Sequence, residues 1–209
     1  MASSRRRGDE SSATRALLLE AAEQLMREEG YQAVTTRRLA SRVGVSNQLV
    51  HYYFSTMDDL FVALLRRRAE LNIRKLMQAL ASEQPLRALW EFNSDPDEVK
   101  LVIEFVALMN HRKTIGQEGA RHANQLRALE TEALSRILAN YGVTRDVCPP
   151  VCLSILMAGL PRTMVMETSF GVSLGHAEMK AFVDSYLRPL EKGPKPRGRA
   201  PRKRLRRQK

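Results

Sequence analysis

TTRRLASRVGVSNQLVHYYF, residues 35–54, has the residue spacing of two short helices joined by a tight turn. Such a unit needs a small residue where the helices cross, a glycine about four positions later in the turn, and an apolar residue about six positions beyond that. Ala40, Gly44 and Val50 occupy these positions. The segment predicts a DNA-binding helix-turn-helix. An ordinary helical hairpin with a polar outer face fits the spacing equally well.

The second helix of this unit would present its polar face to DNA. Thr35 and Thr36 suit the N-cap of the first helix, and Ser46 suits that of the second. Asn and Gln side chains can read adenine edges with paired hydrogen bonds, and a leucine can touch a thymine methyl group. With Val50 buried, the outward residues are Asn47, Gln48, Leu49, His51 and Tyr52 or Tyr53.

The flanking segments have the pattern of helices that pack against this unit. Residues 18–31, LLEAAEQLMREEGY, place apolar side chains on one helical stripe and reach a helix-stop signal at Gly30. In residues 54–60, FSTMDDL, Ser55 or Thr56 suits an N-cap. Two aspartates follow in the first turn, where acids interact favourably with the helix dipole.

Over residues 14–62 the chain resembles the TetR family of transcriptional repressors. The resemblance is carried by a first helix ending in G-Y, then by T-T-x-x-L-A-x-x-x-G-V-S, and by Y/H-x-F before an acidic helix start. It implies an all-α protein, with an N-terminal three-helix helix-turn-helix DNA-binding domain followed by a helical ligand-binding and dimerisation domain. It also implies a repressor that binds double-stranded DNA as a homodimer and is released by a small-molecule effector.

The resemblance also implies roles for single residues. Arg37 is expected to reach a guanine and Arg38 a phosphate; the alternative for either arginine is a solvated helix residue. His51 stands where the family usually has tyrosine, and Met57 where it usually has lysine, so the phosphate contacts depart from the family pattern at these positions. The predicted DNA-binding residues are Thr36, Arg37, Arg38, Ser46, Asn47, Gln48, Leu49, His51, Tyr52, Tyr53 and Thr56.

The net charge of +11 lies mostly at the end of the chain. Residues 191–209 contain ten Lys or Arg and one acid, whereas residues 11–190 are nearly neutral. The tail has no apolar periodicity, which predicts disorder and salt-dependent contacts with DNA phosphates; the alternative is a solubilising tail. The predicted parts are a flexible basic N-terminal arm (1–12), the helix-turn-helix domain (13–60), the effector-binding and dimerisation domain (61–190), and this basic tail (191–209).

The rest of the composition predicts a cytoplasmic bacterial protein associated with the nucleoid and not with a membrane. No apolar run approaches the roughly 20 residues that a membrane span needs. Cys148 and Cys152 have the spacing of neither a zinc site nor a C-x-x-C redox motif, which predicts buried, reduced thiols. The histidines are scattered, and the chain contains no nucleophile or phosphate-loop motif. We therefore expect no enzyme activity, no metal and no cofactor.

Beyond the helix-turn-helix the pattern stays helical, and no β-strand is expected. The last two helices are apolar, and the first of them should kink near Gly159 and Pro161. Helices are expected over residues 58–81, 85–92, 96–112 and 116–141, then from 150 to before 171, and finally over a segment that carries an apolar stripe from 179 to 190.

Residues 101–109, LVIEFVALM, are apolar around most of a helix, so this helix should be buried on nearly all sides. It can line a cavity for a largely apolar effector, with aromatic and methionine walls and His111, Asn110 or Arg112 as a polar anchor. The alternative is that these residues form the core. The predicted effector-binding residues are Trp90, Phe92, Phe105, Met109, His111, Met157 and Met164.

The apolar stripe of the last helix must pack on another surface. It either completes the core or, with the apolar helix before it, pairs with the same helices of a second subunit; the resemblance favours the second arrangement. Two recognition helices about 35 Å apart would then read a palindromic operator. The predicted interface residues are Met157, Met179, Phe182, Val183, Tyr186 and Leu187.

A second function also fits the sequence, namely a nonspecific DNA-compacting protein that relies on its basic tail. Deletion of residues 191–209 separates the two functions, because it would abolish binding by a compacting protein and only weaken a specific repressor.

Overall fold

The structure is a computed structural model that describes residues 2–191, with side chains from residue 13 onward. Over this range the chain forms nine α-helices and one short 3-10 helix and contains no β-strand, which confirms the all-α prediction. The elements are α1 (Ala2–Glu29), η1 (Tyr31–Ala33), α2 (Thr36–Val43), α3 (Asn47–Tyr53), α4 (Met57–Leu80), α5 (Pro85–Ser94), α6 (Pro96–His111), α7 (Lys113–Asn140), α8 (Pro150–Ser169) and α9 (His176–Glu191).

Local signals begin and end the helices of the helix-turn-helix. The Thr35 hydroxyl caps α2 by accepting a hydrogen bond from the backbone N–H of Arg38. Gly44 ends α2 with φ +75°, a left-handed conformation that glycine adopts without steric cost. The Ser46 hydroxyl then caps α3 by accepting from the backbone N–H of Leu49. Of the two predicted caps of α2, Thr35 is confirmed and Thr36 is instead the first residue of the helix; Ser46 and the turn glycine are also confirmed.

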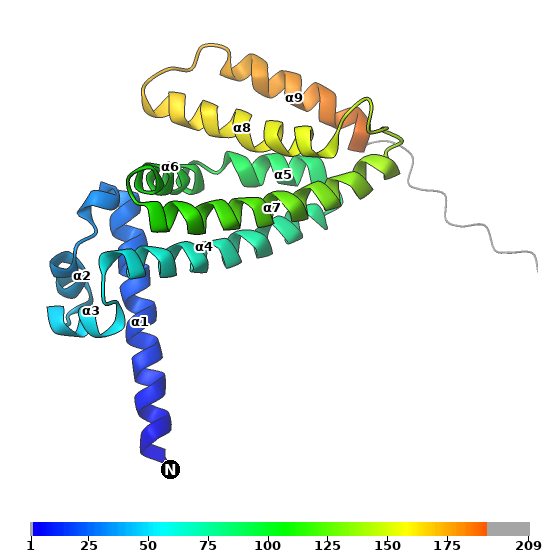
Figure 1. Ribbon diagram of the computed structural model, residues 1–209. Helices are drawn as coiled ribbons and strands as arrows, with labels where there is room; N and C mark the ends of the chain where they lie inside the picture. Colours follow the sequence, from blue (N-terminus) through cyan, green and yellow to red (C-terminus); the bar gives the residue numbers. More distant parts are fainter. Residues whose placement is uncertain (1, 192–209) are drawn as a thin grey trace, which may run out of the picture.

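A 24-residue helix, α4, links the helix-turn-helix to the rest of the molecule. Thr56 and Asp59 form a reciprocal capping box at its start. In Figure 1, α1, α2 and α3 lie at one end, and α4 runs from that end alongside α7. Helices α8 and α9 lie on the side away from the N-terminal end of α1.

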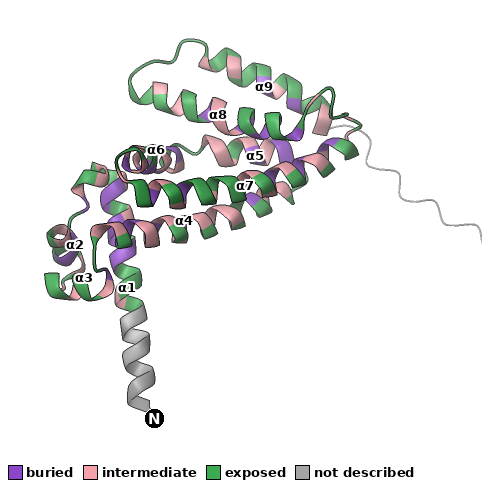
Figure 2. Cartoon of the chain, in the orientation of Figure 1, coloured by how far each residue is buried: buried purple, intermediate pink, exposed green. Residues whose placement is uncertain are grey.

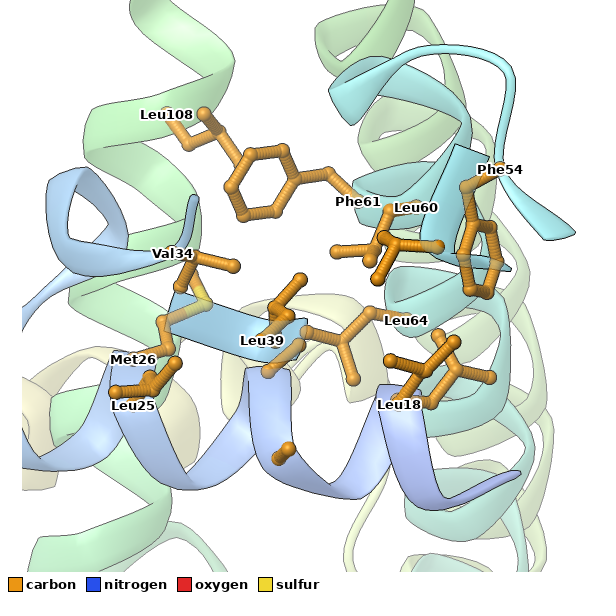
Figure 3. Packing of buried hydrophobic residues seen from close by; sticks show 14 of the residues in the cluster. Leu18, Leu25, Met26, Val34, Leu39, Phe54, Leu60, Phe61, Leu64 and Leu108 are labelled. Atoms are coloured by element: carbon orange, nitrogen blue, oxygen red, sulfur yellow. The ribbon is translucent and has the colours of Figure 1, made fainter. Parts of the chain in front are cut away.

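The first hydrophobic core joins α1, α2 and α3 to α6. Leu18 of α1, Leu39 of α2 and Val50 of α3 are almost completely buried in it. In Figure 3, Phe61 of α4 points toward Leu108 of α6, which belongs to the same cluster. The helix-turn-helix core therefore continues past residue 60 and is closed by α4 and α6.

A second core lies between the far end of α4 and the helices α5, α7, α8 and α9. Its buried residues are Leu76, Leu86, Leu89, Leu134, Leu138, Leu153, Met157, Val183 and Leu187. This cluster holds the distal part of the molecule together.

The structure departs from the predicted boundaries in two places. Helix α1 begins at Ala2, whereas a flexible arm was predicted for residues 1–12. Helix α7 begins at Lys113, three residues before the predicted start at 116. Helix α8, in contrast, keeps the predicted bounds, since it runs from Pro150 to Ser169 with Pro161 inside it. The predicted basic tail, apart from Glu191, lies outside the described residues.

Within residues 2–191, α8 is the one helix long and apolar enough to cross a membrane. A single helix of this kind is weak evidence for a membrane, since its length and composition are its only support. Only 28% of its most apolar window is buried in the subunit, so much of α8 is free to contact another surface.

Candidate functional site

Helix α3 presents polar side chains on its outer face. Asn47, Gln48 and His51 are exposed, and Tyr52 is 76% exposed. Tyr53 is half-buried and packs edge-to-face against Tyr52, with 5.2 Å between the ring centroids. This face has the length and polarity of a recognition helix that enters a major groove.

Two of the predicted DNA-binding residues act as caps. The Ser46 Oγ accepts a hydrogen bond from the Leu49 backbone N–H at 3.2 Å, and Leu49 itself is half-buried. The Thr56 Oγ1 accepts from the Asp59 N–H at 3.1 Å, and Asp59 Oδ2 accepts from the Thr56 N–H at 2.9 Å. Ser46 and Thr56 therefore fix where α3 and α4 begin. Near them, Thr36 is half-buried, with its hydroxyl 3.5 Å from the sulfur of Met57.

The two arginines at the start of α2 lie in different surroundings. Arg37 is exposed and forms no ion pair with any residue that the structure describes. Arg38 donates to both carboxylate oxygens of Glu29, and this hydrogen bonding holds the pKa of Glu29 below its usual value. Arg38 must leave Glu29 before it can bind a phosphate, whereas Arg37 is free to reach DNA.

A hydrogen bond ties α6 to the segment between α1 and α2. Glu104 of α6 accepts a hydrogen bond from the backbone N–H of Tyr31 through its Oε2, at 2.8 Å. Gly30, with φ +86°, lies directly beside this carboxylate. Movement of α6 would therefore act on the connection that leads into the helix-turn-helix.

An ion-pair network joins α1, α4 and α6. Arg68 of α4 is only 7% exposed and donates to Glu23 of α1 at 3.2 Å and to Glu98 of α6. Lys75 and Arg27 lie 3.0 and 3.5 Å from Glu98. Burial alone would raise the pKa of Glu98, but the hydrogen bonds and charges of Lys75 and Arg68 bring it below the usual value.

A cavity of about 180 Å³ lies between α4, α6, α7 and α8. Two predicted effector-binding residues, Phe105 and Met109, line it. Met109 packs against Gly119 of α7, where its sulfur occupies the space that a Cβ would need. The polar residues of the lining are Arg68, Asn72, Glu98, His122 and Arg162.

The other predicted effector-binding residues are not brought to this cavity. Trp90 and Met164 line a separate hollow of about 410 Å³ beside α5, α8 and α9. Phe92 packs against the second core, and Met157 is buried within it. His111 is exposed at the end of α6. The periodicity of these helices identified apolar side chains but not the helix that each one faces.

Sequence reasoning missed the polar residues of the cavity, although one signal was present. Leu60, Leu64 and Arg68 follow one another at intervals of four on α4, and the two leucines are fully buried. An arginine on such an apolar stripe must be paired to be buried. This spacing therefore marked Arg68 as a paired residue of the interior.

The predicted dimer stripe divides between two faces. Met157, Val183 and Leu187 are at most 9% exposed within their own subunit, so they cannot give a second subunit a large contact area. Phe182 and Tyr186 are 65% and 51% exposed. Met179 is half-buried, and Figure 2 shows that much of α8 and α9 is exposed.

The two cysteines are free thiols. Cys148 is half-buried, and burial raises the pKa of its thiol. Cys152 is exposed, so the prediction that both thiols are buried is wrong for Cys152.

Comparison with known proteins agrees with this geometry. Residues 18–64 match the family model of bacterial regulatory proteins, tetR family. The chain is 26% identical over 142 residues to the HTH-type transcriptional repressor AcnR of Corynebacterium diphtheriae, an alignment that covers 67% of this chain and 73% of that protein. It is 27% identical over 159 residues to the HTH-type transcriptional repressor Rv1474c of Mycobacterium tuberculosis, covering 73% of this chain and 82% of that protein.

The whole fold also has solved counterparts. A TetR transcription regulator from Haloarcula marismortui has a TM-score of 0.67 and 19% sequence identity, and the match covers 84% of this chain and 96% of that one. The helix-turn-helix, the named relatives and the shared fold agree with one another. The chain therefore has an N-terminal segment that matches the tetR family of bacterial regulatory proteins, and as a whole it has the fold of a TetR transcription regulator.

Proposed function

We propose that this regulator is a repressor that binds a palindromic operator as a homodimer and leaves it when a small effector binds. The observation that carries the proposal is the outer face of α3, where Asn47, Gln48 and His51 are exposed while Val50 on the same helix is 1% exposed. The names of the bacterial relatives support repression. The same relatives support a cytoplasmic protein, and binding to DNA would associate it with the nucleoid.

The exposed apolar side chains of α8 and α9 support the dimer. Ile155 and Leu156 on α8 are 54% and 53% exposed, and Phe182 and Tyr186 on α9 are exposed to a similar degree. Clustered apolar exposure of this kind marks interaction sites. We propose a two-fold, four-helix interface built from α8 and α9 of each subunit. These four residues would form the interface, whereas Met157, Val183 and Leu187 would remain in the core of each subunit.

The cavity between α4, α6, α7 and α8 supports a response to an effector. We propose that a ligand beside Phe105 and Met109 shifts α6 relative to α4. Glu104 and the Arg68 network would carry this shift to α1 and η1, which hold the helix-turn-helix. Such coupling is typically about 1–3 kcal/mol, and it is reciprocal, so operator DNA would weaken effector binding by the same factor.

The division into domains follows from this mechanism. We place the DNA-binding unit at residues 13–60 and the effector-binding and dimerisation unit at residues 61–190. The first core spans both units through α4 and α6, which is the packing that a mechanical link between them requires.

Selection of bound sequences from a random DNA pool tests the proposal. The full chain and a variant lacking residues 191–209 would be compared in about 150 mM salt, where nonspecific phosphate binding is weakened. We expect one enriched palindrome that survives removal of the tail. If no motif is enriched and binding disappears with the tail, the protein is a compacting protein instead.

A matched pair of glutamine variants tests the role of α3. Gln48→Ala should relax selection at one position of each half-site and weaken operator binding by about 1–3 kcal/mol per lost base contact. Gln117→Ala removes an exposed glutamine on α7 and should leave the selected sequence unchanged. If Gln48→Ala selects the same motif as the native protein, Gln48 does not contact the bases of the operator.

A further inference from the structure

The size of the cavity limits the ligand to a compact molecule. A cavity of about 150 Å³ with apolar walls holds one benzene molecule, and this cavity measures about 180 Å³. Leu101, Val102, Phe105 and Leu126 supply apolar walls. A ligand with a body of about one aromatic ring and one small substituent therefore fits the space.

The charged side chains that line the cavity differ in whether they have an ion-pair partner. Arg68 is paired with Glu23 and Glu98, and Glu98 is in turn paired with Lys75. The carboxylate in the lining is therefore already held by cations. A cationic ligand would find no free carboxylate among the described residues of this cavity. Phe105 is the one Phe, Tyr or Trp ring in the lining, whereas cation recognition relies on several such faces or on acids.

Arg162 of α8 is different, because it has no carboxylate partner among the described residues. The residue as a whole is exposed, but it lines the cavity and protein atoms surround part of its side chain. Burial of its charge lowers the pKa of Arg162, and the charge of Arg127 acts in the same direction. Arg127 donates to the Ser154 hydroxyl at 2.9 Å. Arg127 belongs to α7 and lies near the carboxylate of Glu130. Arg162 is therefore the cation of the cavity lining that has no carboxylate partner among the described residues.

We infer that the cavity binds a small organic monocarboxylate, with its carboxylate on the guanidinium of Arg162 and its apolar body beside Phe105. An arginine can hold a carboxylate through two parallel hydrogen bonds, which is the strongest pairing available to it. The inference rests on the proposed effector-responsive function, since it names the chemical class of the effector. Ligand binding to the free protein nevertheless tests it without any DNA.

Three probes of nearly equal shape test the inference by calorimetric titration of the full chain. Benzoate is an anion, benzamide its neutral counterpart and benzylamine a cation. We expect benzoate to bind about 10- to 100-fold more tightly than benzamide, the range expected for a hydrogen bond to a charged group, and benzylamine to bind least. Equal affinities for benzoate and benzamide, or no benzoate binding, would overturn the inference.

Variants test whether the carboxylate of benzoate binds to Arg162. Arg162→Gln should reduce benzoate affinity to that for benzamide and leave benzamide affinity unchanged. Arg136→Gln removes an exposed arginine on α7 that pairs with Glu132, and it should change neither affinity. Ala123→Leu, which adds bulk at an exposed position of the cavity lining, should weaken both ligands. Undiminished benzoate binding by Arg162→Gln would overturn the assignment.

The experiments distinguish a failure of the proposed ligand class from a failure of the proposed repressor function. If DNA selection yields a palindrome and benzoate does not bind, the proposed function stands and the ligand class is wrong. If benzoate binds through Arg162 but leaves operator affinity unchanged, the ligand class stands and release by this ligand is wrong.

Discussion

Gly44 holds the turn between α2 and α3 in the left-handed region, at φ +75°. A Cβ added there would meet no atom within 4 Å, so Gly44→Ala introduces backbone strain without a clash. This conformation costs an L-residue about 1–2 kcal/mol, which corresponds to a fall of roughly 2–8 °C in melting temperature for a chain of this size. We expect that fall in calorimetry. We also expect weaker operator binding, because the strain lies in the turn that orients α3.

Gly142 provides the control at the end of α7. Its φ is +74°, and a Cβ there would likewise meet no atom within 4 Å. Gly142→Ala should lower the melting temperature by the same amount and leave operator binding unchanged. An equal loss of operator affinity in both variants would show that general destabilisation, and not the turn, controls binding.

Glu130 is a second residue whose surroundings make a measurable prediction. It is 4% exposed, and its Oε1 has no partner among the described residues. Burial raises the pKa of Glu130, although Ser154 and Arg127 act in the opposite direction. The folded protein therefore binds this proton more tightly than the unfolded chain, in which a glutamate has a pKa of about 4.3.

The sign of the pH dependence follows from that raised pKa. The stability that Glu130 contributes is fully present below about pH 4.3 and is lost as pH rises through the folded-state pKa. Glu130→Gln should therefore raise the free energy of unfolding at pH 7, with a gain that shrinks toward pH 4. Urea unfolding at fixed protein concentration measures it. Glu132→Gln on the exposed face of α7 should give no such gain, and an equal gain at both pH values would contradict the prediction.

Elements could be predicted from sequence where local chemistry begins and ends them. The caps Thr35, Ser46 and Thr56 and the turn at Gly44 act within four residues of themselves, and the structure confirms each one. The family resemblance covered the same segment. The starts of α5 and α6 at Pro85 and Pro96 were likewise readable, since proline suits the first turn of a helix.

Contacts between distant elements could not be predicted in the same way. Helical periodicity shows that α6 has apolar faces, but it does not show that Leu108 completes the core of the DNA-binding helices. The pairs that Arg68 forms with Glu23 and Glu98 join residues 45 and 30 positions apart. The polar lining of the cavity and the inward side of α9 depend on such long-range packing.

The hydrogen bond between Glu104 of α6 and Tyr31 of η1 can be tested by substitution. Glu104→Ala removes the acceptor for the Tyr31 N–H, a hydrogen bond of 2.8 Å to a charged group. Bonds of this kind contribute about 1.5–3 kcal/mol. We expect hydrogen exchange at the Tyr31 amide to speed up by at least roughly tenfold. With a known effector, the change in operator affinity that this effector causes should also be smaller in Glu104→Ala than in the native protein.

Glu104→Gln separates the hydrogen bond from the charge. Its side-chain oxygen can still accept from the Tyr31 N–H, so exchange at that amide should lie between the native protein and Glu104→Ala. Exchange that is unaffected in Glu104→Ala would show that the tie does not protect this segment in solution.

In the whole molecule, the same side chains contact both the cavity and the DNA-binding unit. Arg68 and Glu98 line the cavity, and the same two side chains hold Glu23 and Arg27 of α1. The first core adds an apolar connection between α6 and the helix-turn-helix. A ligand that separates α6 from α4 must therefore disturb the packing of α1, and a rearrangement of α1 must alter the cavity.

The proposed dimer would join two such molecules, and a single charged substitution on α9 tests its interface. Phe182 on α9 is 65% exposed, and Phe182→Glu would place a carboxylate in the proposed apolar interface, where an unpaired charge is costly. We expect a monomer in analytical ultracentrifugation. We also expect operator affinity to fall by about 100-fold or more, because the second half-site is no longer bound at high effective concentration.

Met77→Glu is the matched control on α4. Met77 is 46% exposed and lies outside the α8–α9 face, so this variant should remain a dimer and bind the operator normally. If Phe182→Glu also stays dimeric, the interface lies elsewhere. If it becomes a monomer with full operator affinity, each α3 reads its half-site independently, and effector control must act within one subunit through α1 and η1 rather than through the spacing of two recognition helices.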